Sequence, residues 1–441
     1  MVKNACVTVK AQSHRLKDSQ IFMVWRDLLL ANYILGTPTL TGVKEVAYVS
    51  TFPPRKCGIA TFTADLVNSV GQLGKLRNQK VISIDGRRLS KPTFGGFEHK
   101  IGRDFAEDYV LMANFLNHSS VNVVNIQHEF GIFGGESGEY ICHFLDRIKR
   151  PVATTLHTVL PNFENKAKEV FHDVVAKSTA IVVLNETTRG LLCSYGVPSN
   201  KVKLIPHGCP DLPLVASSKV KPKLGLKNKV VLSTFGLLGR GKGIEHVIEA
   251  LPKIVKKEPR LVYYVLGVTH PQVKKVEGEQ YRNSLLRKAK NLGLRNHVRF
   301  LNRFLSKTEL YTYLQATDVY ITPYLSPNQV SSGTLSYALA AGKAVVSTPY
   351  LHAKEALGEG RGLFCRFNDS ESIAEQVTTV IENPILRRSL EKKAYHYSRK
   401  FTWPHVAQKY LELFDELTMH SEAKCHTASP IKNRLPQSVY R

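Results

Sequence analysis

Apolar runs alternate with amphipathic stretches along the chain from Val43 onward. The runs are continuous rather than alternating with polar residues, which is typical of strands buried on both faces of a parallel sheet. In the first half they predict strands at residues 46–49, 80–84, 121–126, 152–156, 181–184 and 202–205. A second series predicts strands at residues 230–234, 261–266, 298–300, 319–321, 344–347 and 362–365. Apolar positions at helical spacing predict intervening helices, among them residues 61–73, 165–177, 244–256, 281–292 and 307–315.

This alternation predicts an α/β fold with two Rossmann-like domains, each built on a doubly wound parallel sheet. Ligands of such sheets bind at the carboxyl ends of the strands, so we expect the two domains to face a cleft. The predicted parts are an N-terminal extension at 1–43, a first domain at 44–215, a basic linker at 216–228, a second domain at 229–395, a C-terminal helix packing back on the lobes at 396–417, and a disordered tail at 418–441.

Positive charge is the unusual feature of the composition. The 441 residues include 61 Lys and Arg against 36 Asp and Glu, which gives a formal net charge of +25. Such a charge suits phosphorylated small molecules, peripheral contact with an anionic membrane, or nucleic acid. No zinc-finger spacing, helix-turn-helix signal or RNA-binding aromatic motif accompanies it, so nucleic acid is the weakest of these partners. No apolar run approaches the ~20 residues that a membrane span needs.

The seven cysteines are scattered, odd in number and without Cys-x-x-Cys spacing. This pattern argues against a disulfide scaffold or a structural zinc site, and for a reducing compartment. We therefore expect a cytoplasmic protein.

One strand–loop–helix segment, residues 319–342, predicts an anion site. Its strand runs into a loop of small polar residues that opens directly into an Ala-rich helix. The backbone N–H groups that would face a phosphate, aided by the positive end of the helix dipole, are those of Ser331, Ser332, Gly333 and Thr334. The alternative is an ordinary βαβ unit whose loop is merely short and polar.

A glycine-rich stretch, Gly236-Leu-Leu-Gly-Arg-Gly-Lys-Gly243, follows the first strand of the second series. It would set the cations Arg240 and Lys242 beside a helix start, which suits a diphosphate. It lacks the glycine spacing and the Lys-Ser/Thr pair of a Walker loop. The alternative is a glycine-rich turn with solvated charges.

The first half also carries polar residues just past its strands. Arg55 and Gly58 follow the first strand, and His128 and His157 each follow a buried strand. Two histidines at the carboxyl edge of one sheet favour a place in the cleft, although a lone histidine there is often structural. No Asp-x-Asp occurs in the chain, so we expect no metal, and Lys, Arg and helix dipoles would neutralise a diphosphate instead.

Several weak motifs follow one another in a specific order and spacing. They are Pro53-Pro with Gly58, Thr155-Leu-His-Thr158, Val182-Val-Leu-Asn with Tyr195-Gly-Val-Pro, Leu204-Ile-Pro-His-Gly208, Lys242-Gly-Ile, Leu292-Gly-Leu with Val298-Arg-Phe, and Asp318 through Gly342. In this order they resemble the GT-B-fold glycosyltransferases of family 4, the retaining group that uses nucleotide sugars. The resemblance covers residues 44–417.

The resemblance implies how a hexose would move from a UDP- or GDP-sugar. The donor would lie in the second domain, and a carbohydrate or lipid-linked acceptor against the first, with His128 and Arg55 on the acceptor or sugar side. Lys242 would bind the donor diphosphate, the amides near Gly333 would contact phosphate or sugar, and His157 matches a histidine near the donor sugar. In retaining members the acceptor hydroxyl attacks from the leaving-group side and the departing phosphate takes the proton, so no cofactor, metal or protein nucleophile is implied.

The chain departs from the family at two usual glutamates. Alignment on Ala338-Leu-Ala-Ala-Gly342 puts Gln329 and Tyr337 at those positions. The first glutamate normally contacts the donor sugar and the second the nucleotide ribose. Gln329 can still hydrogen-bond hydroxyls but carries no charge, and Tyr337 offers only a phenol. Leu237 also replaces a usual arginine, for which Arg240 would stand in.

We therefore expect a metal-independent, retaining hexosyltransferase of a divergent branch. Two alternatives remain open: a GT-B phosphorylase that uses a sugar 1-phosphate, and a catalytically silent protein that binds a nucleotide sugar or glycan. Inorganic phosphate should support turnover by the first, whereas the second should bind a donor without hydrolysis or transfer.

Overall fold

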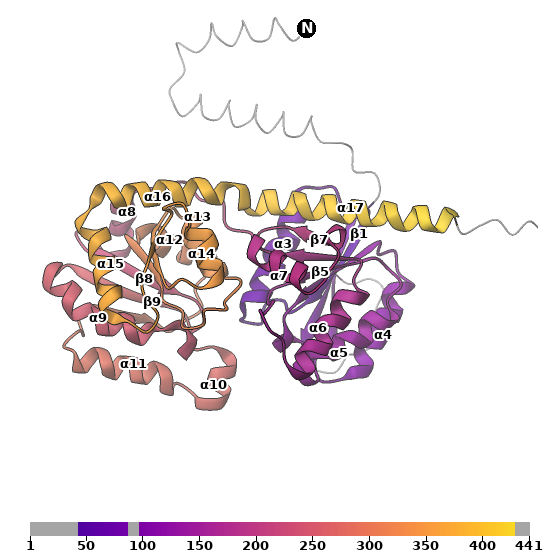
Figure 1. Ribbon diagram of the computed structural model, residues 1–441, viewed down its shortest axis with the longest axis horizontal. Helices are drawn as coiled ribbons and strands as arrows, with labels where there is room; N and C mark the ends of the chain where they lie inside the picture. Colours follow the sequence, from indigo (N-terminus) through magenta and orange to yellow (C-terminus); the bar gives the residue numbers. More distant parts are fainter. Residues whose placement is uncertain (1–42, 87–96, 428–441) are drawn as a thin grey trace, which may run out of the picture. The chain divides into compact units, whose positions relative to one another are not determined.

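The computed structural model of the protein describes residues 43–86 and 97–427 (Figure 1). Of the predicted N-terminal extension only Val43 falls within these ranges, and residues 428–441 of the predicted tail fall outside them. Val43 is buried, and its backbone N–H donates a hydrogen bond to Asp415 Oδ1 at 3.2 Å. No helix in the described ranges is long and apolar enough to cross a membrane.

Seven parallel strands form the first sheet, in the order β3-β2-β1-β4-β5-β6-β7. Their bounds are β1 Glu45–Ser50, β2 Asn78–Asp85, β3 Glu98–Gly102, β4 Val123–His128, β5 Val152–Leu156, β6 Ala180–Val183 and β7 Val202–Leu204. The strands β1, β4, β5 and β6 are buried along their whole length, as expected for strands covered on both faces.

Six parallel strands form the second sheet, in the order β10-β9-β8-β11-β12-β13. Their bounds are β8 Val230–Phe235, β9 Leu261–Leu266, β10 Val298–Leu301, β11 Val319–Thr322, β12 Ala344–Ser347 and β13 Leu363–Phe364. In both sheets the order reverses in the middle, between β1 and β4 and between β8 and β11, which is the Rossmann arrangement. The predicted α/β fold with two doubly wound sheets is confirmed.

The apolar pattern missed one described strand, β3. Its sequence is Glu-His-Lys-Ile-Gly, and it pairs with β2 alone at the edge of the first sheet. An edge strand needs no continuous apolar run, because one of its long sides is not covered by a neighbouring strand. Continuous apolar runs mark only strands that are buried on both faces, so they do not mark β3.

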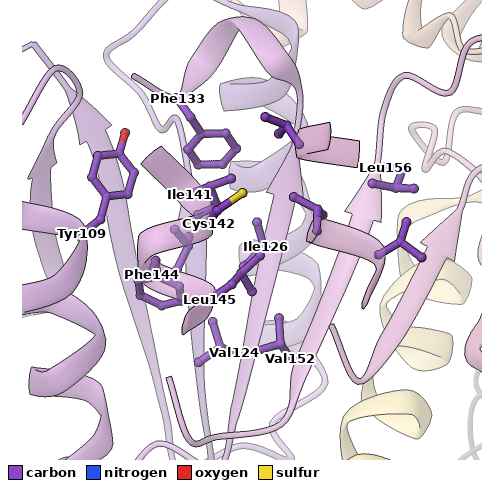
Figure 2. Packing of buried hydrophobic residues seen from close by; sticks show 14 of the residues in the cluster. Tyr109, Val124, Ile126, Phe133, Ile141, Cys142, Phe144, Leu145, Val152 and Leu156 are labelled. Atoms are coloured by element: carbon purple, nitrogen blue, oxygen red, sulfur yellow. The ribbon is translucent and has the colours of Figure 1, made fainter. Parts of the chain in front are cut away.

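Helices cover the two faces of the first sheet. One face carries α4 Ala106–Asn117, α5 Tyr140–Arg147 and α6 Asn165–Lys177, whose apolar side chains form one core with the strands. Figure 2 shows part of this core, with Phe144 and Leu145 of α5 close to Val124 of β4 and Val152 of β5. On the other face α3 Gly58–Gln72 contacts α17 Trp403–Thr427. The helix α7 Glu186–Ser194 follows β6.

The second sheet is covered in the same way. One core joins it to α9 Ile244–Lys257, α11 Gln280–Asn291 and α15 Ser370–Glu382. Side chains on the other face of this sheet, from β11 and β12, form a second core with four helices. These are α12 Lys307–Ala316, α13 Gly333–Ala340, α14 Leu351–Leu357 and α16 Pro384–Ser398. Both sheets are therefore central layers between two layers of helices, and loops at the strand ends are left to carry a site.

The segment predicted as a basic linker packs against the second domain. It contains the short helix α8 Ser217–Val220, and the side chain of Lys221 behind it is buried. The Lys221 ammonium donates to Asp318 Oδ2, and the Ser217 hydroxyl donates to the other oxygen of the same carboxylate at 2.6 Å. Asp318 immediately precedes β11, so these bonds tie the segment to the second sheet.

The segment predicted as one C-terminal helix at 396–417 is divided in the structure. The helix α16 ends at Ser398, a short turn follows, and α17 begins at Trp403. At the start of α17 the Thr402 hydroxyl lies 2.7 Å from His405 Nδ1 in the first turn. The helix continues to Thr427 rather than stopping near Leu417, since residues 418–427 contain neither the glycine nor the proline that would end it.

Candidate active site

The helix that follows β11 begins at Gly333, after a loop of small polar residues. Ser332 caps it, since its side-chain oxygen accepts a hydrogen bond from Leu335 N at 3.3 Å. The first amides of a helix have no partner within that helix. The amides of Gly333 and Thr334 therefore lie at the positive end of the α13 dipole, where an anion is stabilised.

Lys242 lies beside this helix start, above the ring of Tyr324. Its Nζ is 3.8 Å from the ring centroid, and the Tyr324 hydroxyl is 2.8 Å from Thr334 Oγ1. Burial raises the pKa of Tyr324, but the charge of Lys242 and the surrounding hydrogen bonds outweigh it, and the net direction is downward. In the part of the chain that the structure describes, Lys242 has no carboxylate partner.

The glycine-rich loop that carries Lys242 packs directly on the loop after β11. The Leu325 N–H donates to the Gly241 carbonyl at 3.1 Å. At Gly243 the backbone has φ +63°, and an added Cβ would lie 2.2 Å from the Pro323 carbonyl oxygen. A side chain at this position would push the two loops apart, so glycine is required for the close approach.

The two candidate cations of the loop diverge. Arg240 Nη2 lies 2.8 Å from Glu277 Oε2, at the end of α10 Pro271–Glu277, and its guanidinium stands 5.4 Å from the Tyr281 ring centroid. The hydrogen bond and the charge of Glu277 raise the pKa of Arg240. The structure therefore places Lys242 at the start of α13 and directs Arg240 to α10.

Arg55, from the loop after β1, approaches the same region. Its Nη1 donates to the Ile84 carbonyl at 3.5 Å. Burial lowers the pKa of His270, and the charges of Lys242 and then Arg55 lower it further, so both cations lie near that imidazole. Gly58 begins α3, but an added Cβ there would meet nothing within 4 Å. The fold thus does not require glycine at position 58.

His157 follows β5, and its side chain is oriented by a buried hydrogen-bond network. Its Nε2 lies 2.9 Å from Gln127 Oε1. The amide nitrogen of Gln127 donates to Asn125 and Thr155, so its oxygen faces the histidine and accepts from Nε2–H. In this tautomer Nδ1 is an acceptor, suited to a ligand hydroxyl.

His128, at the end of β4, lies next to His157. The His157 N–H donates to the His128 carbonyl at 3.0 Å, and both ring nitrogens of His128 are buried without a hydrogen-bond partner. The His128 ring stacks on Phe133 with centroids 5.7 Å apart. Burial lowers the pKa of His128 to about 4. Burial, and then the charges of His207 and His128, lower the pKa of His157 to about 3, so both rings are neutral at physiological pH.

Ser331 joins the loop before α13 to the end of β5. Its hydroxyl donates to the His157 carbonyl at 2.9 Å. In the same loop Gln329 Nε2 donates to the Ser331 carbonyl at 2.6 Å, which leaves Gln329 Oε1 as an acceptor. The Asn185 side chain, which caps α7, donates to the Val330 carbonyl. Two elements of the first domain therefore hold this loop.

Tyr337 of α13 points toward the first domain. Its hydroxyl donates to Asp65 Oδ2 on α3 at 2.8 Å, and both residues are buried. Asp65 also forms an ion pair with Lys307 at the start of α12. The phenol is engaged in this contact, so the structure does not bring it together with Lys242.

Three residues that the sequence analysis did not assign help to build the site. Tyr324 positions Lys242, and Phe62 of α3 lies edge-on to His157 and His207, with centroids 4.8 and 5.0 Å away. An added Cβ at Gly333 would lie 2.8 Å from His207 Nε2, so the imidazole covers that glycine. The motif ending in Gly208 was a signal for His207, whereas nothing in the sequence singled out Phe62.

The arrangement can bind a diphosphate and orient hydroxyl groups. The Lys242 ammonium, which has no carboxylate partner within residues 43–86 and 97–427, lies beside helix N-terminal amides. The loop that carries those amides is bonded to His157, the residue with a neutral imidazole acceptor. Such groups stabilise anionic oxygens and hold sugar hydroxyls without changing their own charge. Among the residues with described side chains, no three His, Cys, Asp or Glu lie together as metal ligands would.

Comparisons with known proteins match this chain to glycosyltransferases, and one match is located in the second domain. Residues 217–397 match the family model of glycosyl transferases group 1. An uncharacterized glycosyltransferase of Methanocaldococcus jannaschii is 24% identical over 269 residues, which are 58% of this chain and 64% of that protein. A D-inositol 3-phosphate glycosyltransferase of Corynebacterium efficiens is 24% identical over 277 residues, 60% of this chain and 63% of that protein. The chain thus spans slightly less than two thirds of the length of these relatives.

Solved structures match over more of the chain. HepE of Anabaena, in complex with UDP, covers 84% of this chain and 100% of its own with a TM-score of 0.66 and 16% identity. Sucrose-phosphate synthase from Thermosynechococcus elongatus covers 86% of this chain and 100% of its own with a TM-score of 0.66 and 15% identity. At such identities the likeness is one of fold. The fold of this chain is GT-B, as predicted, and its residues 217–397 match glycosyl transferases group 1.

Proposed function

We propose that the protein is a retaining, metal-independent glycosyltransferase of family 4. It moves a hexose from UDP- or GDP-hexose to a carbohydrate or lipid-linked acceptor. The observation that carries this proposal is Lys242, which has no carboxylate partner among the described residues and stands over Tyr324 beside the start of α13. The match of residues 217–397 and the fold shared with UDP-bound HepE support a nucleotide-sugar donor.

In this proposal the donor diphosphate binds between Lys242 and the first amides of α13. Charge builds up on the diphosphate as the bond to the sugar breaks, and these donors are already aimed at it. Arg55 adds positive charge from the loop after β1, since its charge and that of Lys242 both act on His270. The cations and the helix dipole together take the part that a metal ion plays in other diphosphate sites.

The sugar and the acceptor meet on the side of His157 and His128. His157 Nδ1 and Gln329 Oε1 accept hydrogen bonds from donor-sugar hydroxyls, and His128 lies toward the acceptor. The acceptor hydroxyl attacks the anomeric carbon on the face from which the phosphate leaves. The new carbon–oxygen bond forms as the carbon–phosphate oxygen bond breaks, and the departing phosphate takes the hydroxyl proton.

A second candidate is a silent protein that binds a nucleotide sugar without transfer. It is favoured by the two substituted glutamates, because Gln329 is uncharged and the Tyr337 hydroxyl is bonded to Asp65. The two candidates share the same anion site. They differ in whether bound donor is consumed.

Nucleoside diphosphate release and thermal stabilisation, measured together, separate the candidates. The purified chain is incubated without metal with UDP-, GDP- and ADP-sugars and a panel of carbohydrate and lipid-linked acceptors. We expect release from one donor, and loss of both release and stabilisation in Lys242→Ala. Stabilisation without release across all acceptors would leave only the silent binder. No response to any nucleotide sugar, with turnover of a sugar 1-phosphate, would replace the transferase by the phosphorylase.

Arg240→Ala is the matched control for Lys242→Ala. Both cations lie in the same short loop, but Arg240 pairs with Glu277 and is largely exposed. Exposed ion pairs contribute about 1 kcal/mol or less, so Arg240→Ala should bind the donor within about fivefold of the wild type. An equal loss in both variants would mean that the whole loop, and not the Lys242 ammonium, is responsible.

A further inference from the structure

A cavity of about 170 Å³ lies where both domains meet the end of α16 and the turn after it. None of the residues predicted for the donor or acceptor lines it. Its walls come from the ends of β6 and β7, from α13 and α14, and from the turn before α17. At roughly 30 Å³ per water it has room for about five waters, more than a single phosphate group displaces.

One wall of this cavity carries an unsatisfied imidazole. His352 on α14 is only 9% exposed, and its Nδ1 is buried without a hydrogen-bond partner. Its backbone N–H is used, since it donates to the Gln329 carbonyl at 3.0 Å. A buried polar atom without a partner costs free energy, and a ligand or a water in the cavity would recover it if the ring turned to bring Nδ1 to the cavity surface.

The mouth of the cavity carries a cation. The Lys400 ammonium stands 5.1 Å from the Tyr397 ring centroid and 5.3 Å from that of Phe401. It has no carboxylate partner among the described residues. An ammonium in this state is attracted to any anionic group that enters the cavity.

The two carboxylates in the cavity wall are engaged elsewhere. Glu355 accepts from the backbone N–H groups of Glu186 and Thr187, each at 2.9 Å, and from the Thr187 hydroxyl. Glu186 pairs with Arg189 at 2.7 Å. The groups that keep unused hydrogen-bonding capacity are therefore the Lys400 ammonium, which is a donor, and the His352 imidazole, which becomes a donor when protonated. These groups suit an anion rather than a metal ion.

We propose that this cavity binds a small phosphate-bearing molecule, with the His352 imidazole and the Lys400 ammonium as its phosphate contacts. The apolar lining, including Leu204, Leu339 and Phe401, packs against the remainder of the ligand. Because the walls come from both domains, the bound molecule braces the junction between them. The donor site shares the wall residues His207 and Asn185 with this cavity, but neither is one of the phosphate contacts proposed here.

Binding at this site takes up protons. The titratable and charged groups around His352 are His207, Glu186, Glu355 and Lys400, together with Cys209 and Tyr397 of the lining. Burial lowers the pKa of His352 to about 4, and the charge of His207 adds to this, while that of Glu355 opposes it. A phosphate dianion beside the ring favours its charged form, so the imidazole gains a proton when the ligand enters.

Titration calorimetry on the Lys242→Ala protein tests the proposal, because that variant removes competition from the donor site. Inorganic phosphate, glucose 6-phosphate and glucose are titrated separately in two buffers with different ionisation enthalpies. We expect one site for a phosphate-bearing ligand, with proton uptake, and no binding of glucose. Binding of inorganic phosphate alone would identify the free ion as the occupant, and tighter binding of glucose 6-phosphate would identify a sugar phosphate.

Two variants report on the contacts. Both His352→Phe and Lys400→Met, made in the Lys242→Ala protein, should weaken phosphate binding about tenfold or more, and His352→Phe should abolish the proton uptake. Lys400 is exposed, so its variant keeps the test valid if His352→Phe fails to fold. His396→Phe and Lys392→Met, at exposed positions of α16, are the matched controls. Unchanged affinity in both test variants, equal binding of glucose, or no binding at millimolar phosphate would overturn the proposal.

Discussion

The Ser331 hydroxyl donates a hydrogen bond to the backbone carbonyl of His157 across 2.9 Å, although the two residues are 174 positions apart. Ser331 precedes α13 in the second domain, and His157 follows β5 in the first. The bond uses the main chain of His157, and the imidazole is bonded to Gln127 through Nε2, which leaves Nδ1 for a ligand. The bond therefore fixes the position of the α13 amides, which are proposed to bind the diphosphate, relative to His157, which is proposed to bind the donor sugar.

Replacing Ser331 with Ala should lower kcat by roughly fivefold while changing donor affinity little. The bond contributes about 1 kcal/mol, and losing about 1 kcal/mol of transition-state stabilisation lowers the rate about fivefold. Steady-state kinetics with varied donor concentration measures both constants. Ser284→Ala is the control, because that hydroxyl bonds only within α11. A rise in KM with unchanged kcat would contradict the expected role in alignment.

Tyr324→Leu should weaken binding of a nucleoside diphosphate by about tenfold. The variant removes the ring that holds the Lys242 ammonium, and a desolvated cation–π contact contributes about 1–2 kcal/mol. Tyr324→Phe keeps the ring and loses only the hydroxyl bonded to Thr334, so its effect should be smaller. Calorimetric titration with UDP and GDP measures the affinity of each variant and so ranks the two effects. Equal losses in both variants would show that the hydroxyl, and not the ring, places Lys242.

The sequence predicted the fold because both sheets consist of strands buried on two faces. Continuous apolar runs such as 152–156 mark such strands directly. The edge strand β3 was missed because it is only partly buried and its sequence contains polar and charged residues instead of a continuous apolar run. Local pattern also located the start of α13 and the loop of Lys242, because each is built from consecutive residues.

Contacts between distant segments could not be predicted from local pattern. Tyr324 lies far along the chain from Lys242, and the Asp65 partner of Tyr337 is 272 residues away. Arg240 and Lys242 are two positions apart and look equivalent in the sequence, yet one pairs with Glu277 and the other lies over an aromatic ring. These differences arise from packing between elements, which spacing along the chain does not report.

Tyr337→Phe should destabilise the fold and leave donor binding unchanged. The variant leaves a buried oxygen of Asp65 without the phenol donor, which costs about 1–3 kcal/mol of the free energy of unfolding. Urea unfolding and UDP titration measure the two effects separately. Tyr195→Phe is the control, because its hydroxyl bonds loop carbonyls at a more exposed site. Weakened nucleotide binding by Tyr337→Phe would place the phenol at the ribose instead.

Asp318→Asn should reduce the free energy of unfolding by about 3–5 kcal/mol. The substitution leaves the buried Lys221 ammonium without its counter-charge, which is far more costly than losing an exposed ion pair. Glu371→Gln removes the exposed pair with Lys253 and should cost less than about 1 kcal/mol. Urea unfolding of both variants gives the comparison. Similar small losses would mean that residues 216–228 act as a loose connector.

Acid should destabilise the protein through its buried neutral histidines. His128 shows in which direction the free energy of unfolding changes with pH. The pKa of His128 is about 4 in the folded chain, against an ordinary value of 6.5, because burial disfavours the charged ring. Between these two values the unfolded chain binds more protons than the folded chain. The free energy of unfolding is therefore at its full value above pH 6.5 and falls as the pH drops toward 4. Over this window a single such group contributes about 3 kcal/mol.

His128→Phe should remove part of this pH dependence. Phenylalanine keeps a ring against Phe133 and has no proton to gain. Urea unfolding at pH 7 and pH 4.5 should show that the variant loses about 2–3 kcal/mol less on acidification than the wild type. His396→Phe, at an exposed position, should retain the wild-type difference. If His128→Phe and the wild type lost the same stability, the imidazole would have to be protonated or hydrogen-bonded in the folded protein, contrary to its buried and unpartnered nitrogens.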